Sequence, residues 1–137
     1  GVEDSIRRTI EEREKKAWSK LFMVKRLLRN PAIQRNGYLR SGITLFRAAI
    51  TPVLTYSSDC WFGMSKNMMK NLEQTYRKMM YCFFDIPTNT KYEAVLSELG
   101  LMKIENIIAS QKICFINRIW NEEHDWVNKQ LTIFEPL

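Results

Sequence analysis

Residues 45–61 read LFRAAITPVLTYSSDCW, an apolar run with a proline near its middle and the aromatic pair Trp61 and Phe62 at its end. Apolar side chains before the proline recur at three- and four-residue spacing, which is typical of one helix face; they are Ile43, Phe46, Ala49 and Ile50. Proline deletes one helical hydrogen bond and clashes with the carbonyl four residues earlier. We therefore expect a helix that is kinked or broken at Pro52, with both halves buried. A core helix with an accidental kink is the simpler alternative.

The segment before this run has the pattern of one long helix. We expect it to begin at Asp4 or Ser5 and to end at Asn30, because Pro31 follows. Its apolar stripe consists of Ile6, Ile10, Ala17, Trp18, Leu21, Val24, Leu27 and Leu28. The stripe is interrupted around Arg13 and Glu14, which leaves the turns before Lys15 free to project from the body. A polar loop at residues 30–37 then leads into the helix that meets Pro52.

Two more helical segments follow the run before residue 103. Ser65 is a suitable N-cap for a helix that extends to about Phe84 and has a clean amphipathic pattern. The buried side of that helix is predicted to hold Met68, Met69, Leu72, Tyr76, Met79, Met80 and Phe83. Thr90 and Glu93 have the spacing of a capping box, which opens a short helix that Gly100 closes.

The last predicted helices lie in residues 103–137. Isoleucines fall on more than one side of the segment from Lys103 to Trp120, so we expect this helix to be central in the fold. A further short helix is expected around Trp126. Strand-like alternation occurs only within residues 52–56. The chain is therefore predicted to be all-α, a single helical domain of about five to six helices over residues 1–137.

Composition restricts the class of protein. The chain has 137 residues, 45% hydrophobic and 26% charged, which is ordinary for one globular domain. It has no apolar run long enough to span a membrane and no signal peptide, so we expect no membrane association and an intracellular location, nuclear or cytoplasmic. Gly1 in place of an initiator Met suggests that the chain is cropped from a longer protein.

Residues that would support catalysis are sparse. His124 is the single histidine and lies in a polar segment, which is typical of a surface residue. No CxxC pair, glycine-rich phosphate loop or framed cluster of carboxylates is present, so we predict no catalytic residues, no metal site and no cofactor. Cys82 and Cys114 lie within apolar patterns and are predicted to be small core residues.

The charge of +6 is distributed unevenly. After Glu14 the next acid is Asp59, and residues 15–47 contain nine bases. The predicted nucleic-acid-binding residues are these nine: Lys15, Lys16, Lys20, Lys25, Arg26, Arg29, Arg35, Arg40 and Arg47. A block of one sign suits a surface that follows phosphates. The alternative is a solvated helix whose acids and bases complement its dipole, which does not account for the bases beyond Pro31.

The order of residues from about Lys15 to Trp120 resembles the region that follows the catalytic core in reverse transcriptases of non-LTR, LINE-like retrotransposons. That family has the pattern I-x-P-x-L-x-Y-G-x-E-x-W, matched here by Ile50, Pro52, Leu54, Tyr56 and Trp61, with Ser57 in place of Gly and Asp59 in place of Glu. Later matches are Leu72, Glu73, Arg77, Met79, Met80, Pro87, Thr88, Thr90, Glu98, Leu99, Gly100, Ile104 and Ile107.

This resemblance implies a helical thumb and linker that holds a template-primer duplex beside the palm of an RNA-directed DNA polymerase. The palm with its catalytic aspartates is not in this chain, so the segment alone should not polymerise. The expected partner is nucleic acid, whether RNA, DNA or a hybrid, and a palm domain is a further expected partner. The alternative is a helical protein-interaction or structural domain derived from such an element.

Overall fold

The regular elements of the chain are all helical in the part that the structure, a computed structural model, describes: residues 1–31 and 38–134. In order they are α1 (Val2–Leu28), α3 (Tyr38–Leu45), a π-helical segment (Phe46–Ile50), α4 (Thr51–Leu54), a 3-10 turn (Ser58–Cys60), α5 (Lys66–Phe83), α6 (Tyr92–Leu99) and α7 (Ile104–Phe134). The prediction of an all-α domain is confirmed. Most of the predicted loop at residues 30–37 lies outside the described residues.

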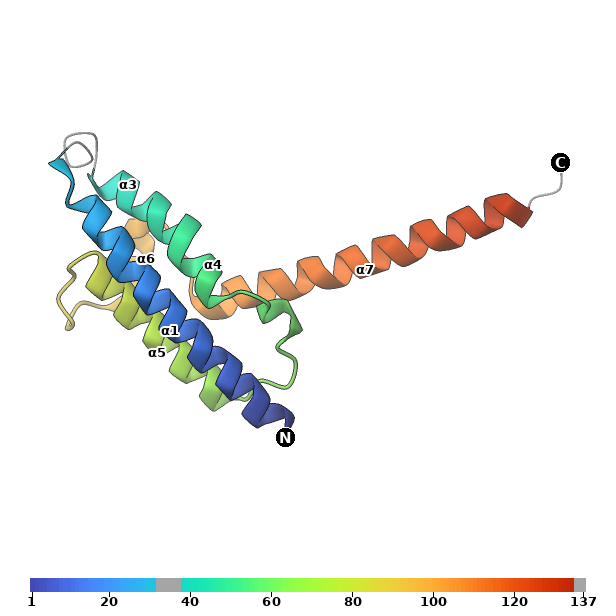
Figure 1. Ribbon diagram of the computed structural model, residues 1–137, viewed down its shortest axis with the longest axis horizontal. Helices are drawn as coiled ribbons and strands as arrows, with labels where there is room; N and C mark the ends of the chain where they lie inside the picture. The colour runs from blue at the N-terminus through green and yellow to red at the C-terminus, as the bar shows by residue number, and fades with distance from the viewer. Residues whose placement is uncertain (32–37, 135–137) are drawn as a thin grey trace.

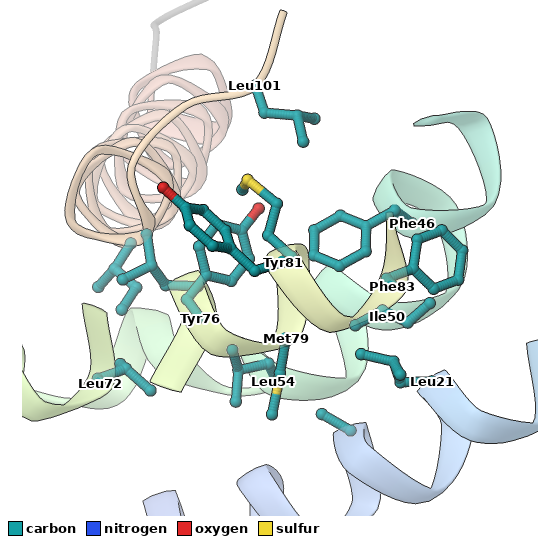
Figure 2. Close-up of a cluster of buried hydrophobic side chains, with 14 of the residues drawn as sticks. Leu21, Phe46, Ile50, Leu54, Leu72, Tyr76, Met79, Tyr81, Phe83 and Leu101 are labelled. Carbon is teal, nitrogen blue, oxygen red and sulfur yellow. The ribbon is translucent and has the colours of Figure 1, made fainter. Parts of the chain in front are cut away.

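The helices form a bundle from which one long arm extends (Figure 1). α1 runs beside the pair α3 and α4, and α6 lies behind (Figure 1). α5 packs against α1 and, through Tyr76 and Phe83, against Phe46 of the π-helical segment. The core between these helices includes Leu21, Phe46, Leu54, Tyr76 and Met79 (Figure 2). Only the base of α7 touches this body, and its remainder projects away (Figure 1).

The first turns of α1 are part of the bundle. Ile6 and Ile10 are buried, and Ile10 lines a cavity with Leu72 of α5, so the expectation that the turns before Lys15 project is wrong. Ala17 and Leu21 are fully buried, as predicted. Leu27 was expected in the same stripe, but 56% of its surface is exposed. At the C-terminal end of α1 the buried face is therefore narrower than the sequence pattern indicates.

Regular α-helix is interrupted immediately before Pro52, as predicted. The π-helical turn of residues 46–50 joins the two halves, so the backbone stays helical rather than breaking. This wider turn accommodates Pro52, which has no amide hydrogen to donate to the helix. The Phe46 carbonyl accepts the backbone amide of Thr51, and the Thr51 hydroxyl donates to the same carbonyl at 3.3 Å. Phe46 and Leu54 are fully buried, so both halves pack in the core.

A buried polar network joins this interrupted helix to its neighbours. The Thr51 hydroxyl lies 3.3 Å from the Tyr76 hydroxyl on α5, and the Thr55 hydroxyl donates to the Thr51 carbonyl at 2.9 Å. The Gln111 side chain of α7 donates to the Thr55 hydroxyl at 3.2 Å and accepts a hydrogen bond from Ser58. Burial raises the pKa of Tyr76 to about 12. The network therefore fixes the base of α7 to the bundle through neutral groups.

Two predicted helix boundaries are confirmed after this network. The Ser65 hydroxyl accepts a hydrogen bond from the Met68 amide at 3.2 Å and caps α5. Gly100 ends α6 with φ of +65°, the left-handed conformation expected there. Ser57, which stands at the glycine position of the LINE-like pattern, has φ of +63°. This left-handed geometry is one that glycine adopts with less strain.

The predicted capping box of α6 is wrong. Lys91, not Thr90, is the N-cap, and the helix has no side-chain cap. The Thr90 carbonyl instead accepts hydrogen bonds from the Arg77 guanidinium at 3.1 Å and the Tyr81 hydroxyl at 2.6 Å. These contacts from α5 hold the residue outside the helix.

α7 begins at a carboxylate of α5. Glu73 Oε2 accepts a hydrogen bond from the Ile104 amide at 2.8 Å, which caps the helix from another element. The other oxygen, Oε1, and the Tyr92 hydroxyl are buried and have no hydrogen-bond partner among the described residues. Burial raises the pKa of Glu73, and burial together with the Glu73 charge raises the pKa of Tyr92.

The expected central position of the helix from Lys103 to Trp120 is wrong. Residues 104–134 form one continuous helix instead of two, and within it only Ile104 and Ile108 are buried among the described side chains. Cys114 is exposed rather than in the core, and Cys82 is half-buried. The apolar residues beyond the base of α7 are therefore not covered by another element of the described chain.

Candidate nucleic-acid interface

The basic residues of α1 lie mainly on its sides away from the core. Lys15, Lys16, Arg26 and Arg29 are exposed, and Lys20 is half-buried. The core face of α1 includes Ala17, Leu21, Val24 and Leu28. At 100° per residue, Lys15 and Arg26 lie roughly opposite that face. Local helix periodicity is therefore enough to direct these charges to solvent.

α3 carries a further exposed base. Its first turn lies beside the end of α1 (Figure 1), and Arg40 is exposed on it. Gly42 faces the core, where an added Cβ would lie 3.2 Å from the Phe84 ring, so Arg40 points outward from the same helix. We call the following set the basic surface: Lys15, Lys16, Lys20, Arg26, Arg29 and Arg40.

The basic surface carries uncompensated charge. Within the described residues, none of its six members forms an ion pair; the ion pairs there are Gly1 with Asp4 and Lys25 with Asp85. The acids of α1 all precede Lys15, and the last of them, Glu14, is half-buried, which raises its pKa. The second half of α1 and the start of α3 therefore carry bases and no acids.

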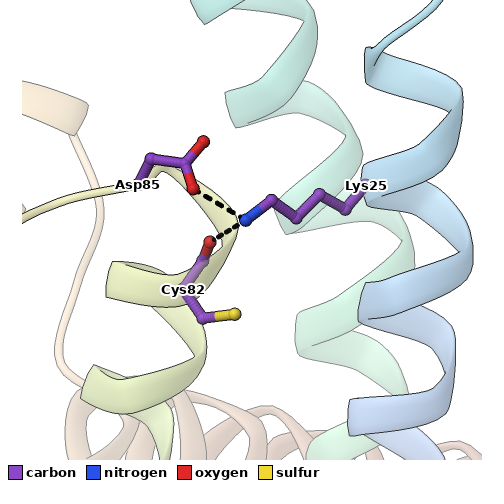
Figure 3. A network of polar contacts seen from close by, with 3 residues as sticks. All are labelled: Lys25, Cys82 and Asp85. Carbon is purple, nitrogen blue, oxygen red and sulfur yellow. Dashed lines mark hydrogen bonds and ion pairs between the residues drawn. The ribbon is translucent and has the colours of Figure 1, made fainter.

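Three of the nine predicted residues do not belong to this surface. Arg35 lies outside the described residues. Arg47 is exposed but lines a cavity of about 280 Å³ with Tyr76 and Gln111, at the base of α7. Lys25 is turned toward α5 (Figure 3). Six of the nine are therefore exposed or half-buried on α1, at its C-cap or on α3, and two are placed elsewhere.

Lys25 serves as a structural contact between α1 and α5. Its ammonium donates to the Cys82 carbonyl at 2.6 Å and to the Asp85 carboxylate at 2.8 Å, and its side chain is only 15% exposed (Figure 3). Cys82 lies in the last turn of α5, where the free carbonyls and the helix dipole favour a cation.

Replacing Lys25 with methionine should therefore destabilise the fold by about 1–2 kcal/mol, because a charge-assisted hydrogen bond to a partly buried carbonyl disappears while the exposed Asp85 is rehydrated. Urea unfolding followed by circular dichroism would measure this destabilisation. The neighbouring Arg26→Met is the control and should change stability by less than about 0.5 kcal/mol. Equal destabilisation in both variants would contradict the assignment.

Apolar side chains lie among the bases of α1, which the sequence pattern did not indicate. Trp18 stacks on Phe22 with ring centroids 5.8 Å apart. Phe22 and Met23 are each 52% exposed. Flat aromatic and apolar groups beside cations suit contact with sugars and bases in addition to phosphates. Helical periodicity correctly assigns Trp18 to the core stripe, against which it packs half-buried, but it does not reveal the stacking on Phe22.

The dimensions of the basic surface fit a nucleic-acid backbone. From Lys15 to Arg29 an α-helix rises about 21 Å, comparable to six steps of a strand whose charges are spaced about 3.4 Å apart. The side chains are long and flexible, and none is held in a pocket that would recognise a base edge. Such an arrangement can neutralise phosphates without reading sequence.

Other types of site have less support. Among the described residues, no group of three or more histidine, cysteine, aspartate or glutamate side chains is placed to hold a metal ion. No helix in the described ranges combines the length and apolarity needed to cross a bilayer. His124 is exposed and stacks near Trp120, with ring centroids 4.5 Å apart. No protein-family model, curated protein or solved structure matches this chain.

Proposed function

We propose that this chain is a non-catalytic, thumb-like domain that binds the backbone of a nucleic-acid duplex through its basic surface. The observation that carries the proposal is the cluster of six bases on α1 and α3 without an ion pair in the described residues. Each phosphate that such a base neutralises releases condensed counterions, which drives binding. The resemblance to the segment after the palm of LINE-like reverse transcriptases points to a template-primer as the duplex.

In this proposal the helices have separate roles. α1 and α3 supply the cations, and Trp18 with Phe22 supplies a flat apolar area between them. α5 and the π-helical segment are the scaffold, because their large side chains fill the core. Polymerisation would need a palm on another part of the protein or on a partner.

Binding should be independent of sequence. We expect two short RNA–DNA hybrids of unrelated sequence to bind with the same Kd, in the sub-millimolar range or tighter at low salt, because the contacts are to phosphates and sugars. Fluorescence anisotropy with end-labelled hybrids and matched DNA duplexes would measure this. A strong preference for one sequence, or no binding at low salt, would contradict the proposal.

A protein-interaction domain is the second candidate, and the apolar arm of α7 favours it. Side chains such as Ile113 and Trp120 are about 60% exposed and are suited to contact protein. This candidate predicts no duplex binding at low salt, so the same titration separates the two.

A further inference from the structure

The arm of α7 carries an apolar face that the bundle does not cover. Beyond its base, the helix exposes seven large apolar side chains, by 41% to 63%: Ile113, Ile116, Ile119, Trp120, Trp126, Val127 and Leu131. At 100° per residue these seven fall within an arc of about 140°. The opposite side carries Arg118, Asn121, Glu122, Asp125 and Lys129. The arm is therefore an amphipathic helix with one apolar and one polar side.

This face differs from the one that packs on the bundle. Ile104 and Ile108 face the body, whereas the apolar arc of the arm is turned away from them by roughly 100°. The arm cannot fold back to bury both faces on the same body, and it projects into solvent (Figure 1). Near the base the outer arc stays accessible, because Ala109 is exposed there. A partner helix can therefore lie along the arm without displacing the bundle.

Two charges within the arc indicate which partner fits. Lys112 and Glu123 are eleven residues apart and lie near the centre of the apolar arc, with little angular separation. On a straight helix they are separated by about 16 Å, so they cannot pair within one chain. Neither forms an ion pair within the described residues, although the Lys112 ammonium lies 5.5 Å from the centre of the Phe62 ring.

A second copy of the same arm can pair with both Lys112 and Glu123 when the two helices are antiparallel, but not when they are parallel and in register. In a parallel pair in register, Glu123 would meet Glu123 of the other copy at the same level, and like charges in a helix seam are destabilising. In an antiparallel pair centred between residues 117 and 118, Lys112 of each copy lies beside Glu123 of the other. That register also places Ile116 near Ile119 and puts Trp126 at the level of the small Ala109 of the opposite arm.

We infer that two copies of this chain associate through antiparallel α7 arms, with Lys112 of each facing Glu123 of the other. The overlap runs from Ala109 to Trp126, about 26 Å of helix. Five of the seven exposed side chains, all but Val127 and Leu131, lie within this overlap and offer on the order of 600 Å² per copy, somewhat less than the roughly 800 Å² per partner of a standard interface. The association does not depend on the proposed nucleic-acid role.

The first test compares oligomeric states of the full chain by sedimentation equilibrium without nucleic acid. The wild-type protein should form a concentration-dependent dimer. Trp120→Glu should weaken dimerisation on the order of thirtyfold or more, because it places a charge in the centre of the seam. The adjacent Asn121→Glu adds the same charge on the polar side and should leave the dimer unchanged.

The second test is a charge exchange. Lys112→Glu and Glu123→Lys should each weaken the dimer, and the double variant Lys112→Glu/Glu123→Lys should recover it, because opposite charges again face each other across the seam. Circular dichroism would check that helicity is kept. A monomer at all concentrations, equal effects of Trp120→Glu and Asn121→Glu, or no recovery in the double variant would overturn the inference.

Discussion

Reversing the charge at Lys15, Arg26 and Arg29 together should lower the affinity for a short RNA–DNA hybrid by at least about a hundredfold at low salt. All three side chains are exposed on α1 and form no ion pair in the described part of the chain, so each is available to a phosphate. Glutamate would abolish three phosphate contacts and add repulsion. The salt dependence of the remaining binding should also be shallower, by about one unit of slope for each phosphate that is no longer neutralised.

The control for this variant reverses Lys66, Lys70 and Lys78 on α5, which are exposed but lie outside the basic surface. It has the same net charge and should keep most of the affinity, apart from a small long-range effect. The two variants should show the same helicity, because none of the six side chains is buried. If affinity falls equally in both, net charge rather than the basic surface controls binding.

Replacing Phe46 with alanine should destabilise the bundle by about 3–5 kcal/mol. Phe46 lies in the π-helical turn, is fully buried and has its ring centre 5.4 Å from that of Phe83 and 5.6 Å from those of Tyr76 and Phe84 (Figure 2). Alanine would leave a cavity between α1, α5 and the interrupted helix. Urea unfolding followed by circular dichroism would measure the change in stability.

Phe62 offers a matched control because it is 52% exposed and lies outside the core. Phe62→Ala removes the cation–π interaction with Lys112 and should cost less than about 1 kcal/mol. A Phe46→Ala variant as stable as Phe62→Ala would show that the π-helical turn does not form the centre of the core.

The sequence predicts those parts of the fold that depend on local periodicity. The stripe of α5, the Ser65 cap and the left-handed Gly100 each follow from residues a few positions apart, and each is confirmed. The interruption near Pro52 is predictable because proline lacks an amide hydrogen. Periodicity does not indicate that the break is a π-helical turn, in which the Thr51 amide and hydroxyl both donate to the Phe46 carbonyl.

Prediction fails where distant residues compete. Thr90 has the right spacing for a cap, but Arg77 and Tyr81 of α5 both donate to its carbonyl. Lys25 belongs to the basic block in sequence, yet it pairs with Asp85, sixty residues away. In α7 the apolar pattern predicts a helix face that should be buried. It does not indicate that the bundle leaves this face exposed.

The candidate interface is predictable to a similar extent. A block without acids, residues 15–47, leads to exposed bases on α1 and α3 because the core needs only the opposite helix faces. Trp18, predicted in the core stripe, is half-buried and packs against the core, but its stacking on the exposed Phe22 was not predicted.

The most direct test of the proposed nucleic-acid interface is the salt dependence of binding. The full chain would be titrated into a labelled RNA–DNA hybrid and a matched DNA duplex at several salt concentrations. If the basic surface contacts phosphates, the logarithm of the association constant should fall linearly with the logarithm of salt concentration, with a slope between roughly −3 and −5. Binding that is absent at low salt, or an affinity that does not change with salt, would contradict it.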